Sequence, residues 1–317
     1  MVVQYCMKKL LVILFLLIPI CSLSSQTSDT LISKYSKAFP TWTLIIPGGS
    51  YLYNGRISEG LTFAALEISG VVIGLKYNST LKNNSTSPYY NYPAVVALKI
   101  FEVDKCDFLR NRLELIKLKA PDFKYDQISE SDLLLAPFKS ENIFTPITIG
   151  FVGAALIELL VTGRRIEQKI NKVEQIYFLD HYIKRNPALT IYGTTSLSLS
   201  WGAGVSEEYL FRNTIMPILD YKYGQTKGLL YSSISFGIGH FTNLAFSNKP
   251  DFGQSLLQVF EATIGGYLLG RDVQNRGYQI GPAVAAHTWY NFTLILGSFL
   301  INPKENVFAV NVKFTVK

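Results

Sequence analysis

Gly204-Val205-Ser206-Glu207-Glu208-Tyr209-Leu210-Phe211-Arg212 is the stretch around which this chain is organised. It places two adjacent carboxylates and an arginine in a segment otherwise apolar enough to lie in a membrane. Each such charge costs roughly 2.5 to 3.5 kcal/mol on insertion scales, so a membrane helix keeps it only when it is paired or functional. On a helix, Glu208 and Arg212 lie on one face, while Glu207 points about 100° away. The spacing predicts a structural pair of Glu208 with Arg212 and leaves Glu207 free for chemistry.

The composition of the 317 residues indicates a membrane protein. The chain is 48% hydrophobic and only 17% charged, whereas soluble domains carry about 25% charged residues. Together with long apolar runs, this predicts an all-α fold, a polytopic transmembrane helix bundle in the lipid bilayer of the cytoplasmic (inner) cell membrane. The net charge of +7 requires no nucleic acid, because excess Lys and Arg gather in cytoplasmic loops. We therefore expect no nucleic-acid partner.

The chain divides into five segments by composition. Residues 1–24 have the basic, apolar and small-residue layout of a signal peptide, and an uncleaved signal anchor is the alternative. Residues 25–76 are expected to form an N-terminal membrane hairpin-like segment, and 77–141 a polar, partly helical extramembrane segment. Residues 142–302 form the main membrane domain, and 303–317 a C-terminal tail.

Apolar runs predict the membrane helices of this main domain at 143–162, 189–205, 229–246, 256–269 and 280–301. Ahead of them, residues 95–118 space apolar side chains as a helix does, among many charges. This predicts a helix on the bilayer surface or against the bundle, and an ordinary amphipathic loop helix is the favoured alternative. Ala262, Gly266 and Gly270 recur every four residues, which predicts a face for close helix packing.

Two of the three histidines lie deep in apolar runs. His240 ends the sequence Ser235-Phe236-Gly237-Ile238-Gly239-His240. His287 lies one helical turn before Asn291, on the same face. Taken alone, either histidine is compatible with a hydrogen-bonded core residue. Polar intramembrane residues usually face one another or a water-filled cavity, however, so we expect these side chains to meet Glu207.

These residues form three motifs in order: Glu207-Glu208-x-x-x-Arg212, Phe236-x-x-x-His240 and His287-x-x-x-Asn291. They resemble the motifs of the CPBP family, the CAAX-prenyl-protease and bacteriocin-processing (Abi) intramembrane endopeptidases. The resemblance spans about residues 189–300 and implies an intramembrane protease domain within 142–302, acting on membrane-associated or secreted peptide or protein substrates. It implies catalytic roles for Glu207, His240, His287 and Asn291, with Glu208, Arg212 and Phe236 supporting the site.

Peptide hydrolysis inside a membrane needs a held water, a base and donors for the oxyanion. The resemblance implies that Glu207 and His240 activate the water, and that His287 and Asn291 serve the oxyanion. We favour a mechanism without a cofactor. A divalent metal such as Zn²⁺, held by Glu207, His240 and His287, is the alternative, although no HExxH or CxxC spacing supports it.

Two other functions remain open from the sequence. One is a catalytically silent member of the same family that binds partners in the bilayer, and the intact motif residues argue against it. The other is a proton- or metal-coupled transporter whose buried Glu and His residues serve as relays. We find no internal repeat in the sequence that would favour such a transporter.

Overall fold

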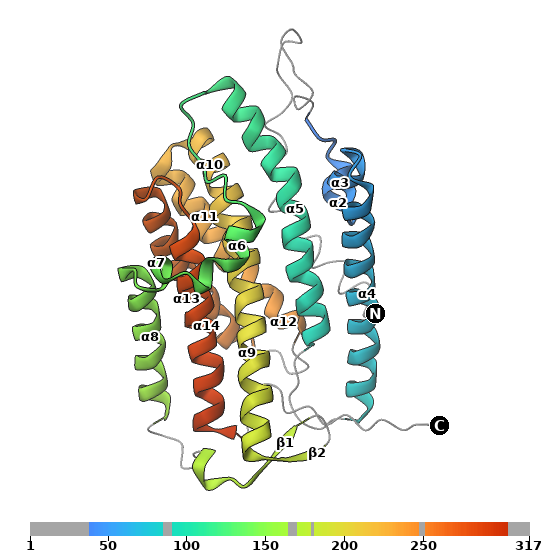
Figure 1. The fold of residues 1–317 in the computed structure, drawn as a ribbon, viewed down its shortest axis with the longest axis vertical. Coiled ribbons are helices and arrows are strands. Elements are labelled where there is room, and N and C mark those ends of the chain that lie inside the picture. The colour runs from blue at the N-terminus through green and yellow to red at the C-terminus, as the bar shows by residue number, and fades with distance from the viewer. Residues whose placement is uncertain (1–37, 85–90, 164–169, 179–180, 247–250, 304–317) are drawn as a thin grey trace.

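The computed structural model describes residues 38–84, 91–163, 170–178, 181–246 and 251–303. Nearly all of them are helical, which confirms the predicted all-α fold. The helices form an elongated bundle (Figure 1). The predicted signal peptide or anchor at 1–24 lies outside the described residues, as does nearly all of the predicted tail at 303–317.

The N-terminal part is a pair of long helices preceded by two short ones. These are α2 (Trp42–Ile45), α3 (Gly49–Tyr53), α4 (Ile57–Asn84) and α5 (Tyr92–Lys119). The helix predicted at 95–118 is thus confirmed as α5. It packs against α4 and α9, which is the placement against the bundle and not the ordinary loop helix that the sequence favoured. Gly70 and Gly74 of α4 bring the helices together, because an added Cβ would lie 2.7 Å from Ala97 Cβ or 3.1 Å from Ala94 Cβ.

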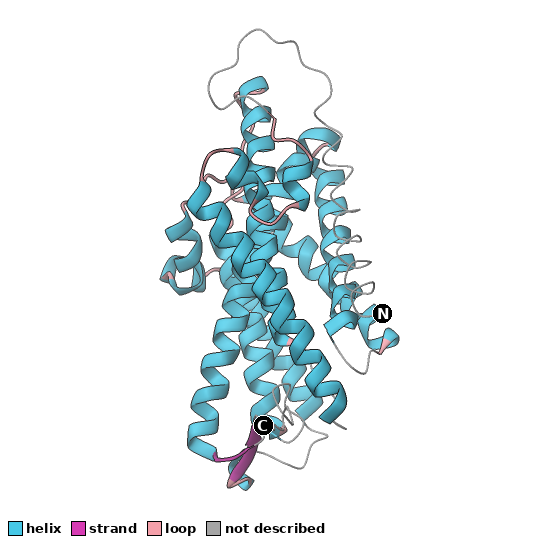
Figure 2. Ribbon diagram, turned by 90° about the vertical axis from the view of Figure 1, so that its right-hand side faces the viewer, coloured by secondary structure: helices cyan, strands magenta, loops and turns pink. Residues whose placement is uncertain are grey.

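A connecting region leads from α5 into the main bundle. It contains α6 (Glu130–Leu135), η2 (Ala136–Phe138), α7 (Ser140–Ile143), α8 (Pro146–Gly163) and η3 (Ile170–Lys172). An antiparallel hairpin follows, β1 (Gln175–Phe178) with β2 (His181–Lys184), pairing Ile176 with Ile183. The hairpin lies at one end of the bundle, opposite α10 (Figures 1 and 2).

The remaining helices hold the three motifs. They are α9 (Arg185–Glu208), η4 (Tyr209–Ile215), α10 (Met216–Tyr223), α11 (Gln225–Gly239), η5 (His240–Thr242), α12 (Asn243–Phe246), α13 (Phe252–Asn275) and α14 (Gly281–Ile301). Helix α14 packs between α8 and α9, and α13 packs along α11. Each apolar run predicted as a membrane helix contains a helix, but the run at 229–246 is divided: α11 ends at Gly239, and the turn η5 separates it from α12.

The small residues predicted on one face of α13 do allow close packing. A Cβ on Gly266 would lie 3.0 Å from both Arg212 Nη2 and Phe236 Cδ1, and one on Gly270 would lie 2.6 Å from Leu229 Cδ1. Ala262, on the same face, lines the cavity described below. Gly266 thus brings α13 against the arginine and phenylalanine of the motifs, and Gly270 brings it against Leu229.

The outer surface carries many large apolar side chains. By length and composition, two helices in the described part of the chain could cross a membrane, Ile57–Tyr77 within α4 and Gly281–Ile301; Pro146–Val161 is a shorter apolar helix. Leu61 on α4, Ile157 on α8 and Phe260 on α13 are each about 60% exposed. Soluble proteins rarely expose contiguous apolar areas of this kind, so these faces suit contact with lipid.

Candidate active site

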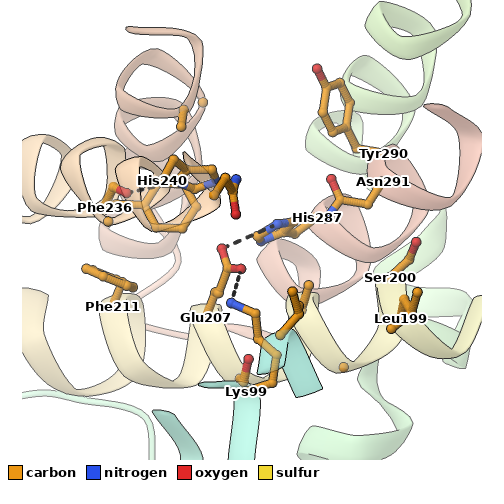
Figure 3. Close-up of a pocket in the computed structure, with 18 of the residues that line it drawn as sticks. Lys99, Leu199, Ser200, Glu207, Phe211, Phe236, His240, His287, Tyr290 and Asn291 are labelled. Carbon is orange, nitrogen blue, oxygen red and sulfur yellow. Dashed lines mark hydrogen bonds and ion pairs between the residues drawn. The ribbon is translucent and has the colours of Figure 1, made fainter. Parts of the chain in front are cut away.

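A cavity of about 1660 Å³ opens among α4, α5, α8, α9, α11, α13 and α14. Its walls are mostly apolar. The predicted catalytic residues Glu207, His240, His287 and Asn291 all line it, together with Phe236. The structure therefore brings residues from three separate helices to one place (Figure 3).

Glu207 lies at the end of α9, and its side chain is only 11% exposed. Its two carboxylate oxygens have different surroundings. Oε1 accepts a hydrogen bond of 2.6 Å from Lys99 Nζ. Oε2 has no hydrogen-bond partner among the described residues and lies 3.8 Å from His287 Nε2 (Figure 3). One oxygen is thus held by an ion pair, while the other is available for chemistry.

His287 is held from behind by Glu208, whose Oε1 lies 2.7 Å from Nδ1 of the imidazole. A carboxylate can only accept, so Nδ1 carries the hydrogen, and in its neutral form the ring presents a lone pair at Nε2. Nε2 and Glu207 Oε2 are then two acceptors facing each other across 3.8 Å. A water molecule between them could donate to both.

His240 is oriented by the backbone at the end of α11. Its Nδ1 lies 2.9 Å from the carbonyl oxygen of Phe236, which can only accept. Nδ1 therefore donates, and Nε2 is left as an acceptor. The Phe236 ring contacts both imidazoles edge to face, with centroids 4.9 Å from His240 and 5.9 Å from His287. The phenylalanine thus packs against both histidines of the motifs.

The predicted pair of Glu208 and Arg212 is present, with Nη1 3.0 Å from Oε1 and side-chain exposures of 0% and 1%. The same Oε1 also accepts from His287, so the pair is part of the site as well as of the core. The Arg212 guanidinium lies 4.0 Å from the centre of the Phe236 ring. Arg212 falls in η4, a π-helical turn that the sequence did not predict. Such turns are frequent at functional sites.

Asn291 follows His287 by one turn of α14 and lies beside it, farther from Glu207 than the imidazole is (Figure 3). Its side chain lines the cavity. An amide at this position can present N–H donors to a substrate carbonyl placed next to the histidine. The expected placement of His287 and Asn291 on one helix face is thus present.

Comparison with known families agrees with these motifs. Residues 192–293 match the family model of the type II CAAX prenyl endopeptidases, Rce1-like. This segment is Rce1-like, consistent with the CPBP family. No curated protein and no solved structure gives a significant match to the chain. The Rce1-like segment contains every site residue predicted from the sequence, and its family consists of membrane-embedded proteases.

Three residues at the site were missed by the sequence reasoning: Lys99, Glu102 and Ser206. Lys99 and Glu102 come from α5, outside the Rce1-like segment and within the stretch expected to be extramembrane. Lys99 Nζ lies 2.9 and 3.1 Å from the two oxygens of Glu102. Ser206 donates to Glu102 Oε2 at 2.7 Å. The i, i+3 spacing of Lys99 and Glu102 was the only local signal, and it is equally typical of an exposed helix face.

The arrangement does not suit the zinc alternative. Within the described ranges, no three His, Cys, Asp or Glu side chains are grouped so as to hold a metal ion. The Lys99 ammonium also lies beside the carboxylate that a zinc ion would need, and a second cation there would be repelled. We therefore derive no step through a metal.

Proposed function

We propose that this protein is a multi-pass intramembrane endopeptidase of the cell membrane that hydrolyses peptide bonds of membrane-associated or secreted substrates. One observation carries the proposal: Glu207 Oε2, buried and without a hydrogen-bond partner among the described residues, faces His287 Nε2 across 3.8 Å at the wall of a large cavity. Two acceptors at that separation suit a water that donates to both, and a held water is the reagent of peptide hydrolysis.

In the proposed reaction, the water donates one hydrogen to Glu207 Oε2 and the other to His287 Nε2, so His287 holds the water and does not take the oxyanion role expected from the sequence. The oxygen lone pair of the water then points into the cavity. As the water oxygen attacks the substrate carbonyl carbon, Glu207 takes a proton from the water. The π electrons of the carbonyl group move to the carbonyl oxygen, which becomes the oxyanion. The Asn291 amide is placed to donate to that oxyanion. When the C–N bond breaks, Glu207 returns the proton to the leaving nitrogen and becomes a carboxylate again.

The fold supports a position within the bilayer. Large apolar side chains are exposed on α4, α8 and α13. Contact of these side chains with water would be unfavourable, whereas contact with lipid chains would not. The charged groups of the site are buried among the helices and paired with one another, as intramembrane charges generally are. A substrate segment lying in the membrane would enter the cavity without first crossing water.

The test compares membrane proteomes of cells that produce the wild type with those that produce Glu207→Gln. New peptide termini that appear only with the wild type support the endopeptidase and supply substrates for assays in proteoliposomes. Ion flux measured in the same proteoliposomes separates the rival functions. Ion flux without cleavage would indicate the transporter. The absence of both flux and cleavage would indicate the silent binding protein.

Replacing Asn291 by alanine should lower kcat by about 10² to 10³-fold with little change in KM, because the amide acts mainly on the oxyanion. Kinetics of the purified variant on an identified substrate check this. Asn142→Ala is the matched control, because that buried amide donates to the Ala136 carbonyl and is not part of the cavity wall. It should lower stability but not kcat. A kcat for Asn291→Ala within threefold of wild type contradicts the assigned role.

Chelators should leave the activity of the purified protein unchanged, since the proposed water is activated by Glu207 and the histidines. Elemental analysis and assays before and after dialysis against a strong zinc chelator check this. Stoichiometric zinc, with activity that is lost on chelation and restored only by zinc, would overturn the metal-free mechanism in favour of Glu207, His240 and His287 as ligands.

A further inference from the structure

Helix α5 reaches the site through one basic side chain. Lys99 is 19% exposed and its ammonium lies between two carboxylates, Glu102 of its own helix and Glu207 of α9. An ammonium has three N–H donors, and the close oxygens around Nζ are those of these two side chains. In Figure 3, Lys99 approaches Glu207 from the side opposite His240 and Asn291.

The contact fixes which carboxylate oxygen faces the cavity. The terminal torsion of a glutamate has a broad, roughly two-fold preference, so the carboxylate turns easily unless an oxygen is held. Lys99 holds Oε1 at 2.6 Å, which leaves Oε2 turned toward His287. Glu102 in turn holds Lys99 and accepts from Ser206. Two successive residues of α9, Ser206 and Glu207, are therefore each connected to α5.

The charges explain why a cation is needed there. Without Lys99, the carboxylates of Glu102 and Glu207 would share a buried site, and like charges in such a site disfavour ionisation of both. A substrate carboxylate is a poor alternative partner for Lys99, because two carboxylates already surround this single ammonium. The geometry therefore suits a role in preparing Glu207 and not one in binding an anionic substrate.

We infer that α5 completes the active site, with Lys99 as the positioning residue that holds Glu207 Oε2 toward the histidines. This inference rests on the proposed function, because it assigns Lys99 a part in the same reaction. It places an essential residue about 90 positions before the first residue of the Rce1-like segment, at 192. The segment by itself would thus lack a group that its own catalytic glutamate requires.

The chain offers a matched control six residues further along the same helix. Lys105 is more deeply buried than Lys99, with 1% exposure, and it also forms an ion pair, with Asp104. It donates to the Ile46 carbonyl at 3.0 Å and so anchors the turn before α3, away from Glu207. Loss of an ion-paired lysine charge is common to Lys99→Met and Lys105→Met, whereas contact with Glu207 belongs only to Lys99.

The experiment measures kcat, KM and Tm for Lys99→Met, Lys99→Arg and Lys105→Met in proteoliposomes or detergent. Lys99→Met should lower kcat by about 10²-fold, a loss that misplacing a reacting group by about 1 Å can cause, and leave KM within about threefold. Lys99→Arg should recover part of that loss. Lys105→Met should lower Tm while kcat per folded protein stays within about threefold of wild type. Equal kcat losses in the two methionine variants, or no loss for Lys99→Met, would overturn the positioning role.

A second measurement does not depend on activity. Dicyclohexylcarbodiimide activates buried carboxyl groups, and an amine in contact with one then forms an amide that mass spectrometry detects as a crosslinked peptide. The wild type should give a crosslink between Lys99 and Glu207, and Lys99→Met should not; a crosslink to Glu102 alone stays within α5 and counts against the contact. A crosslink without any proteolysis would sink the proposed function but keep the contact with α5. Proteolysis without a crosslink, together with an active Lys99→Met, would keep the proposed function and overturn the role of Lys99.

Discussion

Glu207→Gln should abolish proteolysis while the protein remains folded and inserted. Glutamine matches glutamate in shape, but its amide cannot take a proton from the water, so the loss should reach the upper end of the roughly 10²- to 10⁴-fold range of general-base catalysis. Lys99 keeps Glu102 as an ion-pair partner in this variant, which limits the structural cost. Cleavage of an identified substrate by the purified variant, with Tm measured in parallel, checks the prediction.

Glu59→Gln is the control for this change. That glutamate is 47% exposed at the start of α4 and pairs with Arg56, so it reports the effect of a Glu-to-Gln substitution away from the cavity. It should leave both kcat and Tm near the wild-type values. If Glu207→Gln cleaves within tenfold of wild type, Glu207 is not the base, and the histidines would have to accept the proton by themselves.

The motif-bearing half of the fold could be predicted from local patterns. Apolar runs predicted α8, α9, α11, α13 and α14. Among these five helices, all within the described residues, only Gly281–Ile301 is long and apolar enough to cross a membrane, and there only a helix satisfies the backbone of a single segment. The spacing of Glu208 and Arg212 identified their ion pair, which the helix geometry makes almost unavoidable. The motifs also predicted residues that line the cavity. Each of these polar side chains lies in an otherwise apolar segment, which made it recognisable in the sequence.

Lys99 could not be predicted in the same way. It lies in a run that also contains Lys105 and Lys117, and nothing local distinguishes the three. Lys99 meets Glu207, Lys105 anchors the turn at Ile46, and Lys117 donates to the Phe123 carbonyl. Only the packing of α5 against α9 decides which of these lysines reaches the cavity. The extramembrane position expected for residues 77–141 stays a prediction, although α5 within it contributes to the site.

Arg212→Ala is expected to destabilise the protein more than any change at Glu207. Removing one partner of a buried ion pair typically costs about 3 to 5 kcal/mol, because the other charge is stranded. Here Glu208 would stay fully buried, with His287 as its remaining partner among the contacts described above. The guanidinium also packs on the Phe236 ring, and that contact would be lost as well. Thermal unfolding in detergent and accumulation in the membrane measure the effect.

Arg276→Ala serves as the matched control. Arg276 pairs with Asp272 at the same i, i+4 spacing and at 2.7 Å, but it is 33% exposed at the end of α13. Exposed pairs contribute about 0 to 1 kcal/mol, so this variant should melt close to wild type. Similar unfolding temperatures for the two alanine variants would defeat the structural role of Arg212.

The double variant Glu208→Leu/Arg212→Met separates stability from catalysis. Replacing both charges by apolar side chains removes the stranded carboxylate, so part of the stability lost in Arg212→Ala should return. Activity should stay low, because a leucine side chain in place of Glu208 offers no acceptor to the Nδ1 hydrogen of His287, and the ring could then turn or change tautomer. Recovery of Tm with kcat still reduced by tenfold or more is the expected result. Recovery of both Tm and kcat would mean that the role of Glu208 is only structural and that His287 needs no hydrogen-bond partner at Nδ1.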